Sequence, residues 1–89
     1  MDEKKFIVEV KEIIIPLNGK ITQFVEDKKE FGNVTLILNI DEKEYIFETD
    51  RGEILVNKKT IFSVFHDFKS YLSKYEKLLI AIKKTFNKV

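Results

Sequence analysis

The stretch from Ile61 to Phe86 carries an apolar spacing that constrains the fold more than any other part of this chain. Apolar side chains recur there in alternating steps of four and three residues, which is the period of a helix with one apolar seam. The seam consists of Ile61, Phe65, Phe68, Leu72, Tyr75, Leu79, Ile82 and Phe86. No glycine or proline interrupts it. We therefore predict one long C-terminal amphipathic helix over about residues 60–87.

A local signal within this stretch favours a different division. Ser73 and Glu76 have the spacing of a capping box, in which each side chain bonds the backbone N–H of the other residue. The alternative is therefore two helices with a break near Ser73. An unbroken helix would be roughly 40 Å long, whereas a domain of this size has a diameter of only about 30 Å. We expect the part after the break point to overhang a small sheet.

Three strands are predicted before the helix. Val34–Ile40 alternates cleanly between two faces, Tyr45–Thr49 is its partner, and Ile54–Val56 is a short third member. Polar residues 41–44 and 50–53 supply the connections. Asn57 or Thr60 is then expected to cap the helix.

The N-terminal third is less clearly patterned. Phe6–Ile15 is interpreted as a first strand, followed by a bend at Pro16. Asn18-Gly19 is a strong hairpin signal, so this strand is paired with a second one over Lys20–Asp27. The rival interpretation is a helix over residues 20–31 that ends at Gly32. The predicted fold is thus a single α+β domain over residues 1–89. Its antiparallel sheet of four to five strands, within about residues 6–56, is covered on one face by the helix.

Composition restricts the functional classes. The chain has 89 residues, no cysteine and a net charge of +1, and no apolar run long enough to span a membrane. We expect a cytoplasmic location, which would be the cytoplasm of the host cell if the protein is viral. We expect no membrane partner. Residues 60–89 carry six lysines against two acidic residues, a net charge of +4, which leaves −3 on residues 1–59. The heavy use of Lys, Ile and Phe suggests an AT-rich genome, such as that of a low-GC bacterium, a phage or a thermophilic archaeon.

Groups for catalysis or metal binding are sparse. His66 is the only histidine and no cysteine is present, so a zinc site is not expected. The three glycines are isolated, so the chain has no phosphate-binding loop. The acidic residues between Asp41 and Asp50 have the composition of solvated hairpin turns. We expect no enzyme activity, no metal and no cofactor.

Two surfaces remain as candidates for binding. The first is the overhanging apolar part of the helix, which would bind another protein or a second copy of the chain. Its candidate residues are Tyr75, Leu79, Ile80, Ile82 and Phe86. The second is the basic helix face, which would contact nucleic-acid phosphates or another anionic partner. Its candidate residues are Lys74, Lys77, Lys83, Lys84 and Lys88.

The first surface leads to the preferred hypothesis, a small non-enzymatic interaction or regulatory protein. It is expected to form a homodimer, and an inhibitor of a host protein encoded by a phage or mobile element fits this description. Nucleic-acid binding is the alternative. The sheet edges could also accept a partner strand.

Overall fold

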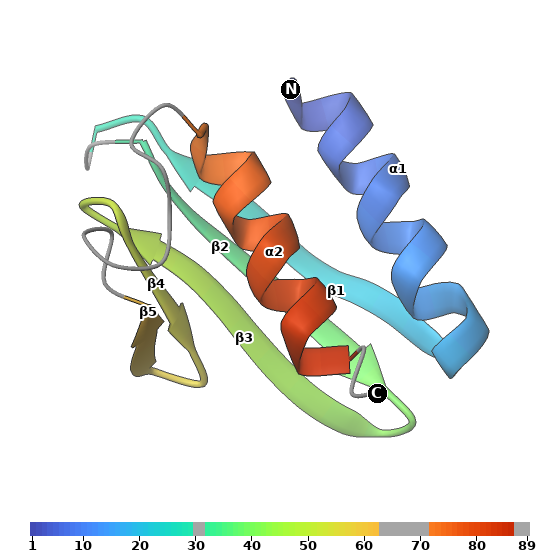
Figure 1. Cartoon of the computed structure of the whole chain (residues 1–89). Coiled ribbons are helices and arrows are strands. Elements are labelled where there is room, and N and C mark those ends of the chain that lie inside the picture. Colours follow the sequence, from blue (N-terminus) through green and yellow to red (C-terminus); the bar gives the residue numbers. More distant parts are fainter. Residues whose placement is uncertain (30–31, 63–71, 87–89) are drawn as a thin grey trace.

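The computed structural model describes residues 1–29, 32–62 and 72–86. Within these ranges two α-helices, a short 3-10 helix and five strands follow one another (Figure 1). Their order is α1 (Glu3–Ile14), a short 3-10 helix η1 (Ile15–Leu17), β1 (Gly19–Asp27), β2 (Asn33–Ile40), β3 (Lys43–Asp50), β4 (Glu53–Val56), β5 (Lys59–Phe62) and α2 (Lys74–Phe86).

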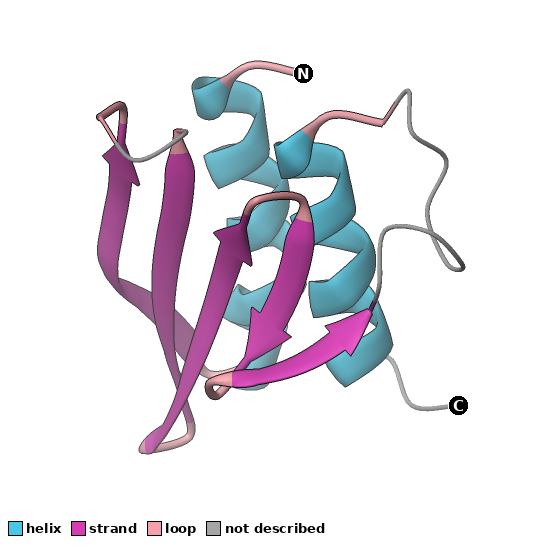
Figure 2. Ribbon diagram, turned by 90° about the vertical axis from the view of Figure 1, so that its left-hand side faces the viewer, coloured by secondary structure: helices cyan, strands magenta, loops and turns pink. Residues whose placement is uncertain are grey.

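The strands form one antiparallel meander in the order β1-β2-β3-β4-β5. Both α1 and α2 lie side by side on the same face of this sheet, and none of the described helices covers its other face (Figures 1 and 2). The predicted class, α+β with an antiparallel meander followed by a C-terminal helix on one face, is confirmed. Among the described residues, no helix is both long and apolar enough to cross a membrane.

The core lies between the sheet and the two helices. From β2, alternate residues Val34, Leu36, Leu38 and Ile40 face the helices and are buried, as their alternation predicts. They meet fully buried side chains from α1 and α2. These are Phe6, Val10, Ile14, Leu78, Ala81 and Ile82.

The strands at Val34–Ile40, Tyr45–Thr49 and Ile54–Val56 are confirmed, and each is part of a longer or equal observed strand. The connection between β2 and β3 is only two residues long. Asp41 and Glu42 both have positive φ angles, of 54° and 67°. Such angles at both central positions match the right-handed twist of the flanking strands.

The prediction of a strand over Phe6–Ile15 is wrong, because residues 3–14 form α1. The three fully buried residues of this helix, Phe6, Val10 and Ile14, are spaced by four, which places them on one helical face. Asp2 caps the helix by accepting a hydrogen bond from the Lys5 backbone N–H at 2.8 Å. Pro16 lies at the start of η1, where its missing N–H leaves no bond unmade.

The Asn-Gly pair therefore joins a helix to a strand rather than two strands. Asn18 adopts the left-handed conformation (φ 61°, ψ 40°) directly after η1 and reverses the chain into β1. Residues 20–27 are part of β1, so the predicted strand is confirmed there and the rival helix over residues 20–31 is wrong.

The C-terminal helix is shorter than predicted. It begins at Lys74, and Thr60 and Ile61, which were predicted to start it, belong to β5 instead. The capping box is present: the Ser73 N–H donates to Glu76 Oε1, and the Glu76 N–H donates to Ser73 Oγ, both at 3.2 Å. A helix begins at the break point that the alternative interpretation proposed. Seam residues Phe65 and Phe68 lie outside the described residues.

Neither predicted cap upstream, Asn57 or Thr60, caps a helix. Asn57 instead starts a tight turn between β4 and β5, with a φ of 52°. Its side-chain oxygen accepts a hydrogen bond from the Ile46 N–H at 2.9 Å, and its own N–H donates to the Ile46 carbonyl at 2.8 Å. The sheet consequently gains a fifth strand, which extends it to Phe62.

Candidate protein-binding groove between α1 and β1

Exposed apolar side chains are concentrated on α1, η1 and β1. Six large hydrophobic residues are exposed in the described part of the chain, and five of them belong to residues 1–25. These five are Met1, Val8, Ile15, Leu17 and Val25. Ile15 is the most exposed at 64%, followed by Val8 at 54%. Exposed apolar residues that gather on one part of a protein mark candidate interaction surfaces.

A groove runs between α1 and β1, and Ile15 is the one of these five residues that lines it. Its cavity volume is about 610 Å³. One wall comes from α1 and η1, and the other comes from the first half of β1. The lining residues are Ile7, Lys11, Ile14, Ile15, Gly19, Lys20, Ile21 and Phe24. Six of the eight are apolar or glycine, and the other two are lysines.

Spacing along α1 explains how the groove is walled. Ile7, Lys11 and Ile14 recur at steps of four and three, so they share one side of the helix. The neighbouring side of the same helix, with Phe6 and Val10, faces the core. The apolar surface of α1 is therefore wider than the sheet can cover. It continues from the core into the groove.

Gly19 allows α1 and β1 to approach closely at the closed end of the groove. A Cβ atom at this position would lie 2.9 Å from the Ile14 carbonyl oxygen and 2.3 Å from Ile40 Cδ1. Since real Cβ atoms do not approach a backbone oxygen so closely, a larger residue would force the helix away from the strand. The glycine is needed here for space.

β1 is an outer strand of the sheet, so no other described strand lies on its outer side. It is nine residues long and is interrupted by a register shift between Ile21 and Gln23. Edge strands of this length are templates for pairing with another chain. The groove therefore combines an apolar recess with an accessible strand edge.

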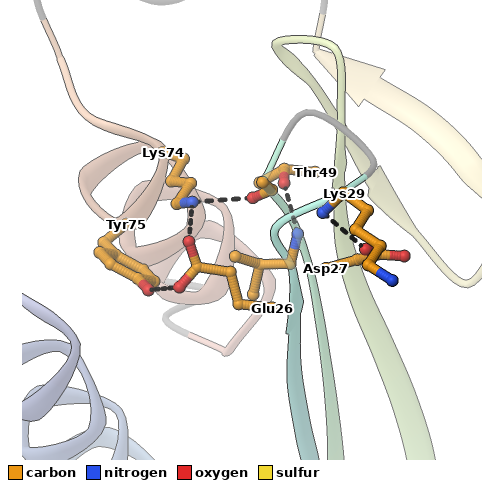
Figure 3. A network of polar contacts seen from close by, with 8 residues as sticks. Glu26, Asp27, Lys29, Thr49, Lys74 and Tyr75 are labelled. Atoms are coloured by element: carbon orange, nitrogen blue, oxygen red, sulfur yellow. Dashed lines mark hydrogen bonds and ion pairs between the residues drawn. The ribbon is translucent and has the colours of Figure 1, made fainter.

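A polar network ties β1 to the start of α2 (Figure 3). Lys74 and Tyr75, at the start of α2, donate hydrogen bonds to the two carboxylate oxygens of Glu26 on β1. Lys74 also donates to the Gly32 carbonyl at 2.7 Å. The Tyr75 ring stacks on Phe6 with the ring centroids 4.9 Å apart, and Phe6 in turn lies 6.1 Å from Phe24.

The network also perturbs ionisation. The hydrogen bond from Lys74, followed by that from Tyr75, holds the pKa of Glu26 below its ordinary value. Burial, with the hydrogen bond to the Glu26 carboxylate, raises the pKa of the Tyr75 phenol well above its ordinary value. At neutral pH the arrangement is an ionised carboxylate held by one ammonium and one phenol, which ties α2 to β1.

The predicted apolar patch on α2 is mostly internal. Tyr75, Leu79 and Ile82 are 7%, 4% and 0% exposed, because α2 packs them against the sheet and α1. Ile80 and Phe86 are half-buried. The expectation that these five residues form an exposed overhang is therefore corrected: a helix of 13 residues fits over the strands.

The predicted basic face is also used differently. Lys74 is paired with Glu26, and Lys77 is buried. Lys83 and Lys84 are exposed in the last turn of α2, where Lys84 has an interaction of its own. Lys88 lies outside the described residues, as does His66. The structure does not present these lysines as one row.

The acidic residues around β3 are separated by the strand itself. Asp41 and Glu42 form the turn before β3, whereas Asp50 ends the strand at the opposite end of the sheet. Glu48 and Asp50 line a hollow of about 480 Å³ that is also lined by Val25 and Leu55. Glu48 pairs there with Lys58 at 3.1 Å. Within the described ranges, no group of three or more His, Asp or Glu residues could hold a metal ion.

Sequence reasoning missed the groove because it assigned residues 6–15 to a strand. A signal for the helix was available, since Phe6, Val10 and Ile14 repeat at steps of four and Asp2 precedes them as a cap. Comparisons with protein-family models, with curated proteins and with solved structures found no match. The groove is therefore interpreted from its own geometry.

Proposed function

We propose that this chain is a non-enzymatic protein-binding module that docks a partner protein at the groove between α1 and β1. The observation that carries the proposal is the position of the exposed apolar side chains. Ile15, the most exposed of them at 64%, lines the groove together with the half-buried Ile7, Ile21 and Phe24. Burying such side chains against a partner would remove apolar surface from water, which is the main favourable term in association.

The structure of the groove supports a docking role in a second way. Phe24 on the β1 wall packs near the rings of Phe6 and Tyr75, and Tyr75 donates a hydrogen bond to Glu26. A surface that is already ordered loses little conformational entropy when a partner binds. An inhibitor encoded by a phage or mobile element, as the composition suggests, would act in this way by occupying a surface of a host protein.

Site-specific photo-cross-linking in the native host tests this proposal. A photoreactive phenylalanine analogue would replace Ile15, which is 64% exposed at the groove. The matched control carries the same analogue at Ile61, which is 39% exposed on β5. We expect one dominant cross-linked protein from position 15 and none from position 61.

The proposal is overturned if position 15 yields no cross-linked protein, or if both positions label the same spread of proteins. In the first case the groove has no partner, and in the second the labelling reflects exposure alone. The predicted homodimer is a separate proposal. Sedimentation equilibrium at micromolar concentration measures it directly, and a species of 10.5 kDa at all concentrations would contradict it.

A further inference from the structure

The geometry points to the kind of partner that the groove accepts: an extended segment of another protein, with alternating apolar side chains and acidic residues, that pairs with the outer edge of β1. This inference rests on the proposed function, because it takes the groove as the docking surface. Three features of the groove carry it, namely the edge strand, the facing of its side chains and the charge of its lining.

The facing of the β1 side chains favours an extended segment. Ile21 and Phe24 pair across the sheet with Leu38 and Leu36, which face the helices. Cross-strand partners share a face, so Ile21 and Phe24 also face the helix layer, where they line the groove. A strand added beside β1 would likewise direct every second side chain towards that layer, into the groove under α1.

The length of the groove suits a short strand. Its helical wall extends from Ile7 on α1 to Ile15 on η1, eight residue steps, or about 12 Å along the helix. An extended chain covers this distance with about four residues, at roughly 3.3 Å each. Two of them would direct their side chains into the groove. The register shift between Ile21 and Gln23 also limits how far a regular ladder can run along β1.

The charge of the lining favours acidic residues beside these apolar ones. Lys11 and Lys20 stand on opposite walls, and no carboxylate is among the lining residues. In the described part of the chain neither lysine forms an ion pair. A carboxylate on the incoming segment would meet an opposite charge on either wall.

The same charges disfavour a second copy of this chain as the occupant. A twofold pairing of two β1 edges would bring the α1 helices of both copies together. Each groove would then face the groove-lining side of the partner's α1, which carries Lys11 and no carboxylate. Like charges brought together in an interface oppose association.

Selection from a displayed library of random dodecapeptides on the purified full chain tests the inference. We expect enriched peptides with apolar residues at alternate positions and with acidic residues between them. Methylation of one backbone nitrogen that faces β1 should weaken a selected peptide about tenfold, because a ladder hydrogen bond is lost. The same modification on the alternate residue, which faces away from β1, is the control.

Substitutions in the chain test the charge argument separately. Lys11→Gln and Lys20→Gln should each weaken binding of a selected peptide about threefold at low salt, and less at high salt. Lys83→Gln, at an exposed position on α2, should leave binding unchanged. Lys11, Lys20 and Lys83 are all surface residues, and circular dichroism checks that each variant is folded.

Three results would overturn the inference. Enriched peptides could show helical spacing or basic residues, the methylated and control peptides could bind equally, or selection could enrich nothing. If position 15 still cross-links one protein in the host, the groove remains a docking surface and only the extended acidic segment is refuted. If cross-linking fails as well, the proposed function is refuted with it.

Discussion

The position of Ile82 leads to a quantitative prediction about what holds this protein together. Its side chain is 0% exposed, packed in the core that α2, α1 and the sheet share. Replacing a fully buried isoleucine by alanine removes three methyl or methylene groups and leaves a cavity, which costs about 2–5 kcal/mol. An 89-residue protein has a total free energy of unfolding of about 4–13 kcal/mol. Ile82→Ala should therefore remove a large share of the stability.

Urea unfolding followed by far-ultraviolet circular dichroism measures this loss. With a denaturant slope of about 1 kcal/mol per molar for a small domain, the unfolding midpoint should fall by about 2–5 M. Ile80→Ala is the matched control on the same helix, because Ile80 is only half-buried. We expect its midpoint to fall by less than half as much.

The protein concentration separates core packing from assembly. If Ile82 acts within one chain, the loss should be the same at every protein concentration. A loss below about 1 kcal/mol would refute the assignment of Ile82 to a tightly packed core. A loss that disappears at low protein concentration would instead show that the residue stabilises a contact between copies.

Three further predictions concern local features. Glu26→Gln should lower the free energy of unfolding by about 1 kcal/mol at neutral pH. Because the pKa of Glu26 is depressed in the folded state, this stabilisation is present above the ordinary value of 4.5 and is lost as the pH falls through the folded pKa. Wild type and variant should therefore have converging stabilities in acid unfolding. Gly19→Ala should shift the thermal midpoint downwards, because the new Cβ meets the Ile14 carbonyl; an unchanged midpoint would contradict the close approach. Ser73→Ala should lower the free energy of unfolding by about 1 kcal/mol in urea, because the helix cap is lost. Thr85→Ala on the same helix is the control, and an equal loss from it would argue against a specific cap.

The middle of the chain shows how far local pattern can carry a prediction. The alternation of apolar residues in Val34–Ile40 predicts only a strand, since burial of one face of a strand requires a period of two. The polar pair that follows, Asp41 and Glu42, closes a tight turn through its own backbone angles. The Ser73–Glu76 box is equally local, because both of its hydrogen bonds form within one helical turn. These elements follow from residues within a few positions of each other.

Residues 6–15 carry two patterns at once. Phe6, Val8 and Val10 alternate as in a strand, while Phe6, Val10 and Ile14 repeat at steps of four as in a helix. β-Branched residues favour a strand only weakly, and packing routinely overrides that preference. The sheet here needs cover for the half that α2 leaves open, and only a helix at this position supplies a stripe that buries Phe6, Val10 and Ile14 together.

The seam at residues 61–86 is the clearest case of a pattern that local reasoning extends too far. Its period is regular from Ile61 onwards, yet Ile61 lies on β5, whose residues on either side of it, Thr60 and Phe62, pair with β4. A residue that fits a helical spacing is equally usable in a strand if a partner edge is available. That choice depends on β4, which supplies the edge, and not on the residues of the seam.

By itself the sequence determined the class of the fold and the three central strands, because these depend on side-chain periodicity. It offered a helix start at Ser73 only as the alternative to one long helix, and it predicted connections longer than the two-residue turns observed. Only the tertiary structure decided the groove between α1 and β1. Ile7, Lys11 and Ile15 meet Ile21 and Phe24 there because Gly19 lets the chain turn back tightly. Such a surface is made by two elements packed against each other, so it has no signature in either element alone.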